Sequence, residues 1–437
     1  MSEKQNVLIF PSATYPAIQI IKCLKNSPRF HIIAGASYPN HAELICDDTV
    51  NDLPNITDPT FWDTIKRFIQ SRNIRYIIPT DETAAMLLKE REVDLSTTIV
   101  CSPYETTQLC RYKSKTYDRL KNEDYIPKIY DNNKIDTIKN YPIFIKPDNS
   151  QGSRGALLIE SEKQLKDIKD IQNFVISEYL PGEEYTVDCF TNKDGELLFC
   201  NPRIRTRLMN GITARGNDVE LTDEFQDIIK AINSKIQFRG YWFAQLKRDT
   251  DGHLKLLEIC TRFAGSFAIS KGKGTNLPLL ALCDFSGLDT EVIQNDYRVE
   301  CDKTYIDRYK LDLTYNHIYI DYDDTITMNN GQAVNPYVIA FLYECKAKNI
   351  KISLITRHKD TFSESLEQSF SDLSLSSSLF DEIIELKWDQ SKKDVIYNPK
   401  GSIFIDNSFK ERKEIHEAYR IPVFDVVDMD CLFDWRF

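Results

Sequence analysis

The chain has 437 residues, of which 42% are hydrophobic and 11% aromatic, so we expect about two to four globular domains and exclude a disordered protein. Its formal net charge of −11 argues against a nucleic-acid partner, because proteins that bind nucleic acids usually carry a basic stripe. No window approaches the ~18 consecutive apolar residues of a membrane-spanning helix, and the N-terminal apolar run is too short for a signal peptide, so we expect a cytoplasmic protein with no membrane partner.

Residues 1–103 show short apolar runs that alternate with helical patterns, which is typical of α/β proteins. Strands are expected at residues 7–10, 31–35 and 75–79. Helices are expected at 18–24 and after Asp58-Pro59, which has the form of an N-cap followed by proline at the first helical position. We interpret this segment as a small Rossmann-like domain. It lacks a G-x-G-x-x-G turn, so we assign it no dinucleotide.

From residue 104 to about 300 the pattern changes to α+β. Ser161 and Gln164 form a capping-box signature, and Asp251-Gly252 is a hairpin turn between two apolar runs. Strands are expected at residues 142–146, 173–179, 185–190, 241–247 and 254–259. Helices are expected at residues 113–122 and 225–236.

A polar stretch at residues 289–312 is interpreted as a linker with some structure. The βαβ rhythm then returns, so residues 313–437 predict a further domain with a parallel sheet. Its strands are expected at residues 317–321, 351–355, 401–405 and 421–427. The whole chain is therefore expected to be a multidomain protein of α/β and α+β domains.

The residues between 104 and 275 are suited to holding a nucleotide triphosphate. Lys113 lies near a helix start and Lys146 ends a strand, while backbone N–H groups of the glycine-bearing loop around Ser153 could cover phosphates. Glu178 and Leu180 end another strand, where an acid and backbone groups can meet an adenine edge.

Oxygen donors and arginines follow in the same segment. Gln245 and Glu258 lie on the two strands of the predicted hairpin and could face one Mg²⁺, which prefers oxygen ligands. Arg262 lies four residues beyond Glu258. Three further arginines could hold an anionic substrate: Arg203, Arg205 and Arg207.

The segment carries, in order, the motifs K-S-K-T-Y, F-I-K-P-D, Q-G-S-R-G, I-S-E-Y-L-P-G-E-E-Y-T-V-D and L-L-E-I-C-T-R-F-A-G. In order and spacing these resemble the ATP-grasp superfamily, of the carbamoyl-phosphate-synthetase-like and carboxylate–amine ligase type. The resemblance spans about residues 1–285. It implies a Rossmann-like pre-ATP-grasp domain at 1–103 and an ATP-grasp domain at 104–300.

The resemblance also implies roles for individual residues. The positions that would hold the phosphates, adenine and ribose of ATP are Lys113, Lys146, Ser153, Glu178, Leu180 and Glu184. Glu258 would bind Mg²⁺, with Mn²⁺ as an alternative, and Gln245 stands close to the position of a second metal-linked side chain. Arg262 would support the transferred phosphoryl group or the acyl phosphate.

The implied reaction activates a small-molecule carboxylate as an acyl phosphate, releases ADP, and joins the acyl group to an amine or similar nucleophile. Relatives of this kind are often homodimers. One position departs from the family, which commonly has Asn two residues after the metal-binding Glu. Here that residue is Cys260, and a neutral thiol is a poor ligand for Mg²⁺.

Acidic residues dominate the chemistry of residues 313–437. The run H-I-Y-I-D-Y-D-D-T is an apolar strand that ends in Asp321, with Asp323 two residues on. Ligands of α/β sheets bind at the carboxyl ends of the strands, where one carboxylate can attack phosphorus and the other can protonate the leaving group. Later strands end in Thr356 and Asp406, and Lys392 precedes the last of these.

These strand-end motifs resemble the haloacid-dehalogenase-like (HAD-like) superfamily across about residues 313–437. The resemblance implies a Rossmannoid phosphohydrolase domain with a minimal cap, acting on a phosphorylated metabolite. Asp321 would be the nucleophile, Asp323 the general acid/base, and Thr356 the phosphoryl-binding residue. Lys392 would neutralise the phosphoryl group, with two alternatives for that role, Lys387 and Lys393.

The metal ligands implied in this domain are Asp321, the backbone of Asp323, and Asp406. Asn407 stands where the superfamily often has a second acid. His358 could meet substrate, but a loop histidine at the surface is the interpretation we favour. The leading hypothesis for the whole chain is a bifunctional ligase and phosphatase. The alternatives are a ligase with a phospho-ligand sensor, and a regulatory protein that binds ATP or a phospho-ligand without turnover.

Overall fold

The structure is a computed structural model that describes residues 4–150, 154–209, 212–304, 306–358 and 365–436. It divides the chain into two compact units, Met1–Tyr305 and Ile306–Phe437, and each is described by itself. The border between the units lies inside the segment that the sequence predicts as a linker. Ser153, one of the predicted ATP-binding residues, lies outside the described residues.

The larger unit begins with a parallel sheet in the order β3-β2-β1-β4-β5. Its strands are β1 (Gln5–Phe10), β2 (Phe30–Gly35), β3 (Asp48–Val50), β4 (Ile74–Pro79) and β5 (Thr98–Ile99). The helices of this part are α1 (Tyr15–Leu24), α2 (Phe61–Ser71), α3 (Glu82–Glu90) and α4 (Glu92–Leu95). Helix α1 starts earlier than its apolar pattern predicts, because Thr14 caps it by accepting a hydrogen bond from Ala17 N.

A small antiparallel sheet follows, in the order β6-β9-β7-β8. Its strands are β6 (Ile129–Tyr130), β7 (Ile143–Pro147), β8 (Leu157–Ile159) and β9 (Phe174–Glu178). Ser161 caps α7 (Glu162–Lys166), as the capping-box signature predicts. The reciprocal bond differs from that prediction, because the Gln164 side chain accepts from Glu160 N rather than from Ser161 N.

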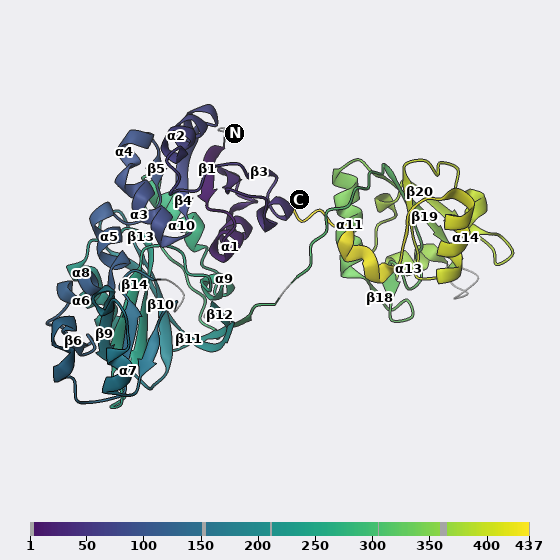
Figure 1. The fold of residues 1–437 in the computed structure, drawn as a ribbon. Helices are drawn as coiled ribbons and strands as arrows, with labels where there is room; N and C mark the ends of the chain where they lie inside the picture. Colours follow the sequence, from purple (N-terminus) through teal and green to yellow (C-terminus); the bar gives the residue numbers. More distant parts are fainter. Residues whose placement is uncertain (1–3, 151–153, 210–211, 305, 359–364, 437) are drawn as a thin grey trace. The chain divides into compact units, whose positions relative to one another are not determined.

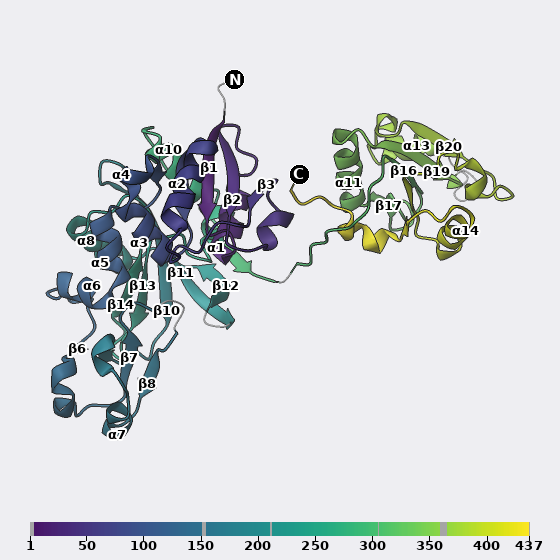
Figure 2. The same cartoon turned by 45° about the horizontal axis from the view of Figure 1, so that its top comes forward.

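A larger antiparallel sheet has the order β14-β13-β10-β11-β12-β15. Its strands are β10 (Glu184–Thr191), β11 (Leu197–Met209), β12 (Ile212–Asp218), β13 (Gly240–Arg248), β14 (Leu254–Cys260) and β15 (Glu300–Asp302). Helices α5 (Tyr104–Arg111), α6 (Lys113–Arg119), α8 (Asp223–Lys235), α9 (Ala268–Gly272) and α10 (Leu277–Phe285) complete the unit. Both ribbon views place this sheet between the parallel sheet and the small antiparallel sheet (Figures 1 and 2).

The core beneath the larger antiparallel sheet explains how its strands are held. Helix α8 buries Phe225, Ile229 and Ile232, on the apolar face that the sequence predicts. Trp242 of β13 is fully buried and stacks on Phe238 with ring centroids 3.9 Å apart. Strand β15 pairs with β12, so three residues in the middle of the predicted linker belong to this sheet.

The smaller unit contains a parallel sheet in the order β20-β19-β16-β21-β22. Its strands are β16 (His317–Ile320), β19 (Lys351–Thr356), β20 (Glu382–Glu385), β21 (Ser402–Ile405) and β22 (Val423–Phe424). A short hairpin of β17 (Thr327–Met328) and β18 (Ala333–Val334) follows β16. The helices are α11 (Pro336–Ala347), α13 (Leu366–Asp372) and α14 (Phe409–Tyr419).

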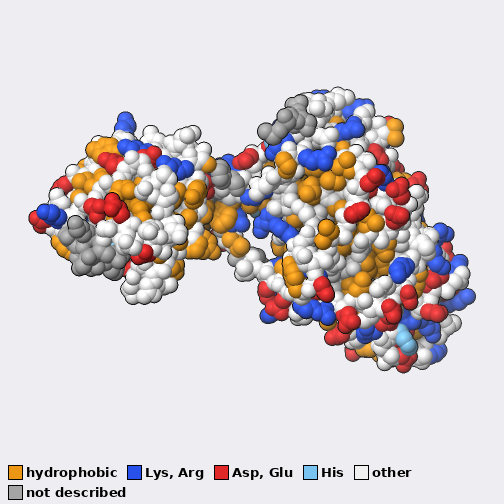
Figure 3. All heavy atoms as spheres, turned by 180° about the vertical axis from the view of Figure 1, so that it is seen from behind, with side chains coloured by type: hydrophobic (Ala, Val, Ile, Leu, Met, Phe, Trp, Pro, Cys, Tyr) orange, Lys and Arg blue, Asp and Glu red, His pale blue; other side chains and the backbone are white. Residues whose placement is uncertain are grey.

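Charged side chains of both signs lie on the face of the protein that Figure 3 shows. On the face of the larger unit drawn in Figure 3, lysines and arginines are interspersed with aspartates and glutamates. Among the described residues, no helix combines the length and apolar character needed to cross a bilayer.

Candidate active sites

The two lysines predicted to hold phosphates lie close to the same small cavity, of about 110 Å³, in the larger unit. Lys113, the first residue of α6, is 6% exposed, and its Nζ donates to the backbone oxygen of Ser150 at 2.9 Å. The same Nζ lies 3.4 Å from Glu258 Oε2. The cavity therefore brings together a cation from α6 and a carboxylate from β14.

Lys146 of β7 is the second lysine, and it is 7% exposed. Its Nζ donates to Tyr117 Oη at 2.8 Å and to the backbone oxygen of Leu257 at 2.7 Å. Burial, which disfavours the charged form, lowers the pKa of Lys146 to about 8, although nearby Glu258 acts in the opposite direction. This ammonium group is poorly compensated, so an incoming anion would stabilise it.

The residues predicted to frame adenine and ribose line the same cavity. Glu178 ends β9, and its Oε1 accepts a hydrogen bond from Lys128 N at 2.8 Å. Leu180 is 4% exposed. Glu184 begins β10 and forms an ion pair with Arg205, so a residue predicted for the ribose contacts one predicted for the substrate.

The two predicted oxygen donors, Gln245 and Glu258, face each other in register on β13 and β14. The Glu258 side chain is 24% exposed. Both residues line the small cavity and also a second, larger cavity of about 800 Å³ in the same unit. A carboxylate and an amide oxygen on adjacent strands suit Mg²⁺, which takes hard oxygen ligands.

The larger cavity extends to the carboxyl ends of β1 and β4 and carries a basic wall. Its lining includes five arginines: Arg111, Arg154, Arg203, Arg205 and Arg262. Arg203 is 1% exposed, and its guanidinium binds the Asp188 carboxylate through Nε at 2.8 Å and Nη2 at 3.1 Å. This paired charge is held rigidly at the cavity wall.

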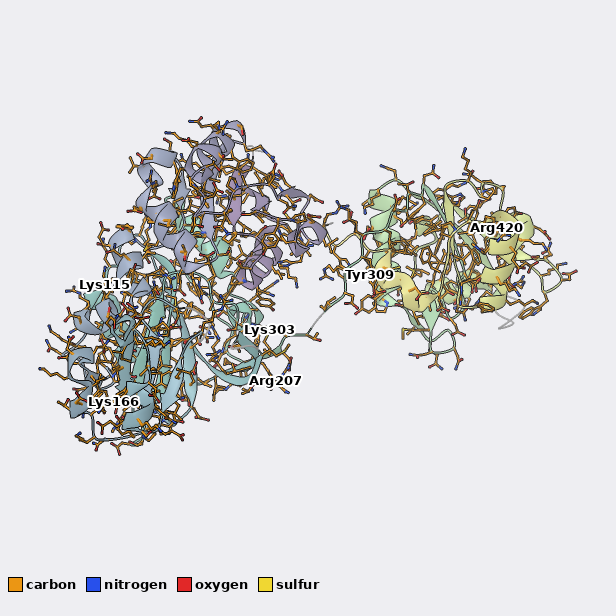
Figure 4. The ribbon with its side chains drawn as sticks, viewed as in Figure 1. Lys115, Lys166, Arg207, Lys303, Tyr309 and Arg420 are labelled. Carbon is orange, nitrogen blue, oxygen red and sulfur yellow. The ribbon has the colours of Figure 1, made fainter. Side chains whose placement is uncertain are left out.

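Arg207 does not share this environment. It lies near the end of β11, with a side chain 47% exposed (Figure 4), and it forms an ion pair with Asp302. It is not among the residues that line the cavity. The structure therefore brings Arg203 and Arg205 together at the larger cavity and places Arg207 apart from them, where the register of β11 against β12 shifts. A shared substrate role for all three arginines stays a prediction.

Arg262 lies at the wall of the larger cavity, as its predicted role requires, and it has a partner that the sequence did not indicate. Its Nη2 donates to Glu82 Oε1 at 3.0 Å. Arg111 Nη1 donates to Glu82 Oε2 at 3.0 Å, and Cys260 Sγ lies 3.5 Å from Glu82 Oε1. Glu82 opens α3, in the parallel-sheet part of the unit, and no local motif pointed to it.

The comparisons with known proteins bear on this unit. Residues 170–305 match the family model described as ATP-grasp in the biosynthetic pathway with Ter operon. The larger unit has the mixed α/β ATP-grasp fold. No curated protein matches the chain.

Several solved structures share the fold at low sequence identity. The biotin carboxylase domain of Hydrogenobacter thermophilus 2-oxoglutarate carboxylase, in complex with MgADP, ADP and bicarbonate, has a TM-score of 0.55 at 14% identity, over 69% of this chain and 74% of that chain. Biotin carboxylase from Campylobacter jejuni has a TM-score of 0.56 at 14% identity, over 68% and 75%. An L-amino acid ligase from Bacillus licheniformis has a TM-score of 0.53 at 17% identity, over 64% and 74%.

The strand-end acids of the smaller unit converge on one lysine. Lys392 is 4% exposed, and its Nζ donates to Asp321 Oδ1 at 2.6 Å and to Asp406 Oδ2 at 2.7 Å. Burial and the nearby Asp406 raise the pKa of Asp321 to about 7, while Lys392 acts against this shift. Of the three candidate lysines, Lys393 instead pairs with Glu414, so the geometry favours Lys392.

Asp323 lies beside Thr356 and His358. Thr356 Oγ1 donates to Asp323 Oδ2 at 3.3 Å, and His358 Nδ1 lies 2.7 Å from Asp323 Oδ1. His358 is 1% exposed. The favoured interpretation of His358 as a surface histidine is therefore wrong, because the β19 end turns the ring inward, where it packs edge-on against Tyr322.

Thr325 connects the first and last strand ends of this site. Its Oγ1 lies 3.5 Å from Asp321 Oδ2, and it accepts a hydrogen bond from Asn407 N at 3.1 Å. Asn407, in the place of a second acid, uses its side-chain oxygen to accept from the same hydroxyl at 3.4 Å.

Proposed function

We propose that the larger unit is an ATP-dependent, ADP-forming ligase that activates a carboxylate as an acyl phosphate and joins it to an amine or similar nucleophile. One observation carries this proposal: a small cavity with two buried lysines and a larger arginine-walled cavity share the oxygen donors Gln245 and Glu258. The phosphate end of a nucleotide bound in the small cavity would then lie beside an anionic substrate bound in the larger cavity. The ligase and carboxylase neighbours support this assignment at the level of the fold.

Within this proposal, Lys113 and Lys146 hold the phosphates of ATP, and the loop that includes Ser153 covers them. Glu178 and Leu180 contact adenine. Glu184 contacts the ribose. The structures of similar fold that contain MgADP or a β,γ-ATP complex support a nucleotide in this unit.

Gln245 and Glu258 are the residues that would hold Mg²⁺, or Mn²⁺ in its place. When bound, the cation neutralises charge on the phosphates. Cys260 would not be a ligand, because its thiol is oriented toward Glu82 and sulfur is a poor partner for this ion.

In the proposed reaction, a carboxylate oxygen of the substrate attacks the γ-phosphorus of ATP. The bond from that phosphorus to the bridging oxygen breaks, and its electron pair leaves with ADP. The amine then attacks the acyl carbon, loses a proton, and displaces phosphate. Lys113, Lys146 and Arg262 neutralise the negative charge of the phosphoryl group during its transfer. Arg203 and Arg205 hold the anionic substrate.

A nuclear magnetic resonance experiment tests this proposal. The Asp321→Asn protein, in which any phosphatase activity is silenced, is incubated with Mg-ATP and a pool of cellular acids and amines, and ³¹P spectra are recorded. ADP that appears only with the pool is the expected result. AMP with pyrophosphate would refute the acyl-phosphate mechanism, and ATP binding without turnover would favour the regulatory alternative.

We propose a second activity, a HAD-like phosphohydrolase, for the smaller unit. The observation that favours it is the convergence of Asp321, Asp406 and Lys392 at one strand-end edge, beside Asp323 and Thr356. The parallel sheet places these groups where open α/β sheets bind ligands.

In this activity an Asp321 oxygen attacks the phosphorus of a phosphorylated metabolite, and Asp323 gives a proton to the leaving oxygen. Water then attacks the aspartyl phosphate, with Asp323 taking back a proton. Thr356 and Lys392 hold the phosphoryl oxygens. Asp321, the backbone of Asp323, and Asp406 would hold Mg²⁺, which when bound neutralises the phosphoryl group.

Hydrolysis of p-nitrophenyl phosphate with Mg²⁺ tests this second activity. We expect hydrolysis by the wild-type protein and loss in Asp321→Asn. Asp324→Asn is the matched control, because Asp324 is exposed and its positive φ of 54° suits asparagine. If neither the wild-type protein nor Asp321→Asn hydrolysed p-nitrophenyl phosphate, the proposed phosphatase activity would be refuted. We also propose that the protein is cytoplasmic, that it acts on small-molecule substrates, and that it forms a homodimer. The structure of the Hydrogenobacter thermophilus neighbour, which is a dimer, supports the last point.

A further inference from the structure

Glu82 is a single carboxylate that joins separate parts of the larger unit. It belongs to the first turn of α3, after the parallel strand β4, and its partners lie on α5 and at the end of β14. Its two oxygens bind Arg111 and Arg262, each at 3.0 Å. The contact with Arg262 spans 180 residues of sequence.

The two arginines held by Glu82 both line the larger cavity. Their side chains are only 13% and 16% exposed, and that of Glu82 is 12% exposed. Charges so far from water interact strongly, and they are costly to leave unpaired. Glu82 bridges the two guanidinium groups with one charge-assisted hydrogen bond to each, and this restricts the rotamer freedom of both arginines. Glu82 therefore determines where both cations stand in the cavity wall.

The neighbouring carboxylate has a different set of partners. Glu258 lies near Lys113, on the side of the small cavity, whereas Glu82 receives the thiol of Cys260 at 3.5 Å. At the end of β14, Glu258 is thus paired with a lysine of the small cavity, whereas Glu82 is paired with two arginines of the larger cavity. The Arg262 Nε atom is buried and has no hydrogen-bond partner within the described residues. The guanidinium consequently retains a donor that an anion could satisfy.

We propose that Glu82 is a positioning residue for phosphoryl transfer, which acts by holding Arg262 and Arg111 in the orientation that meets the transferred phosphoryl group. This inference rests on the proposed ligase function. Under this proposal, the parallel-sheet part of the larger unit helps to hold the transferred phosphoryl group, although it carries no predicted ATP-binding residue.

The test uses the full chain with MgADP, alone and with fluoroaluminate, a stand-in for a phosphoryl group in transfer. Binding is measured by calorimetry in wild type, Glu82→Gln, Glu82→Ala and Glu82→Asp. We expect fluoroaluminate to increase the affinity of the wild-type protein for ADP. In Glu82→Gln and Glu82→Ala this increase in affinity should be smaller by about tenfold or more. Binding of MgADP alone should stay unchanged, and Glu82→Asp should recover part of the gain.

The matched control is Glu90→Gln, at the exposed far end of the same helix. A purely structural role would weaken ADP and ADP–fluoroaluminate binding together. A positioning role predicts that Glu82→Ala has no further effect once Arg262→Ala and Arg111→Ala are both present. A full gain in Glu82→Ala, or an added loss when Glu82→Ala is combined with both arginine variants, would overturn the inference. If wild type binds MgADP but shows no gain, the proposed phosphoryl transfer itself fails, and the inference with it.

Discussion

The ammonium of Lys146, a residue that lines the small cavity of the larger unit, donates to the phenol oxygen of Tyr117 across 2.8 Å. Tyr117 is 4% exposed, and its hydroxyl also bonds the backbone oxygen of Leu257 at 2.6 Å. The buried charge is thus stabilised by neutral dipoles and not by a bonded carboxylate. Nucleotide phosphates would supply the missing counter-charge.

Tyr117→Phe should destabilise the ligand-free protein, because it removes an acceptor from a buried ammonium group. We expect the free energy of unfolding to fall by about 1–3 kcal/mol, measured by denaturant titration. Tyr104→Phe, at a partly exposed phenol that contacts Glu90, is the control and should change it by less than about 0.5 kcal/mol. An equal effect of both substitutions would contradict the role of Tyr117.

Nucleotide binding should depend on pH through Lys146. The folded-state pKa of about 8 is lowered by burial, so the group is charged below pH 8 and neutral above it. The affinity for Mg-ATP should therefore fall from pH 7 to pH 9, measured by calorimetry in buffers of different ionisation enthalpy. Proton uptake on binding should be largest between the pKa of about 8 in the free protein and the higher pKa in the complex. Lys146→Met should bind weakly at all pH values and should abolish this proton uptake.

Lys392→Met should be far more harmful than Lys393→Met. Removing Lys392 leaves the buried carboxylates of Asp321 and Asp406 without a cation, which we expect to cost about 3–5 kcal/mol of stability. Hydrolysis of p-nitrophenyl phosphate should also be lost. Lys393, 41% exposed and paired with Glu414, should tolerate the change within about 0.5 kcal/mol. The reverse order of effects would reopen the choice among Lys387, Lys392 and Lys393.

His358 should influence phosphatase turnover through Asp323. His358→Leu removes the ring nitrogen that lies 2.7 Å from Asp323 Oδ1, so the carboxylate loses the contact that orients it. We expect kcat to fall by about tenfold, and His358→Asn, which retains a polar donor, to lose less. Steady-state kinetics with p-nitrophenyl phosphate provide the measurement. A change in KM alone would argue against an orienting role.

The substrate arginines should separate into two groups. Arg205→Ala removes a cation that lines the larger cavity, so ADP release with the acid and amine pool should fall by about tenfold or more. Arg207→Ala alters an exposed pair with Asp302 and should leave ADP release within about twofold of wild type. If Arg205→Ala and Arg207→Ala reduced ADP release equally, the separation of Arg205, which lines the larger cavity, from Arg207 would be contradicted.

Local patterns in the sequence predicted much of the fold. Short apolar runs between helical patterns identified strands such as β1 and β16. N-cap residues such as Ser161 identified the starts of helices. Strand-end chemistry also pointed to Asp321 and Asp406, because parallel strands deliver their carboxyl ends to one edge. These are signals that a few neighbouring residues carry.

Contacts made across long stretches of chain were not predictable in this way. Glu82 looked like an ordinary first-turn glutamate, because its partner Arg262 is 180 residues away. Tyr117 lay within a recognised motif, but its bond to Lys146 depends on how α6 packs beside β7. His358 was misplaced at the surface because one residue in a strand-end turn can face either way. A sequence pattern does not determine that direction.

The pairing of β15 with β12 has a practical consequence for separating the two units. β12 would otherwise be the edge of the six-stranded sheet, with unpaired backbone groups open to other chains. A fragment cut at residue 299, just before β15, would uncover that edge and should self-associate. A fragment that keeps residues 300–304 retains its edge strand. Isolation of the larger unit therefore depends on a three-residue strand that the sequence alone would assign to the linker.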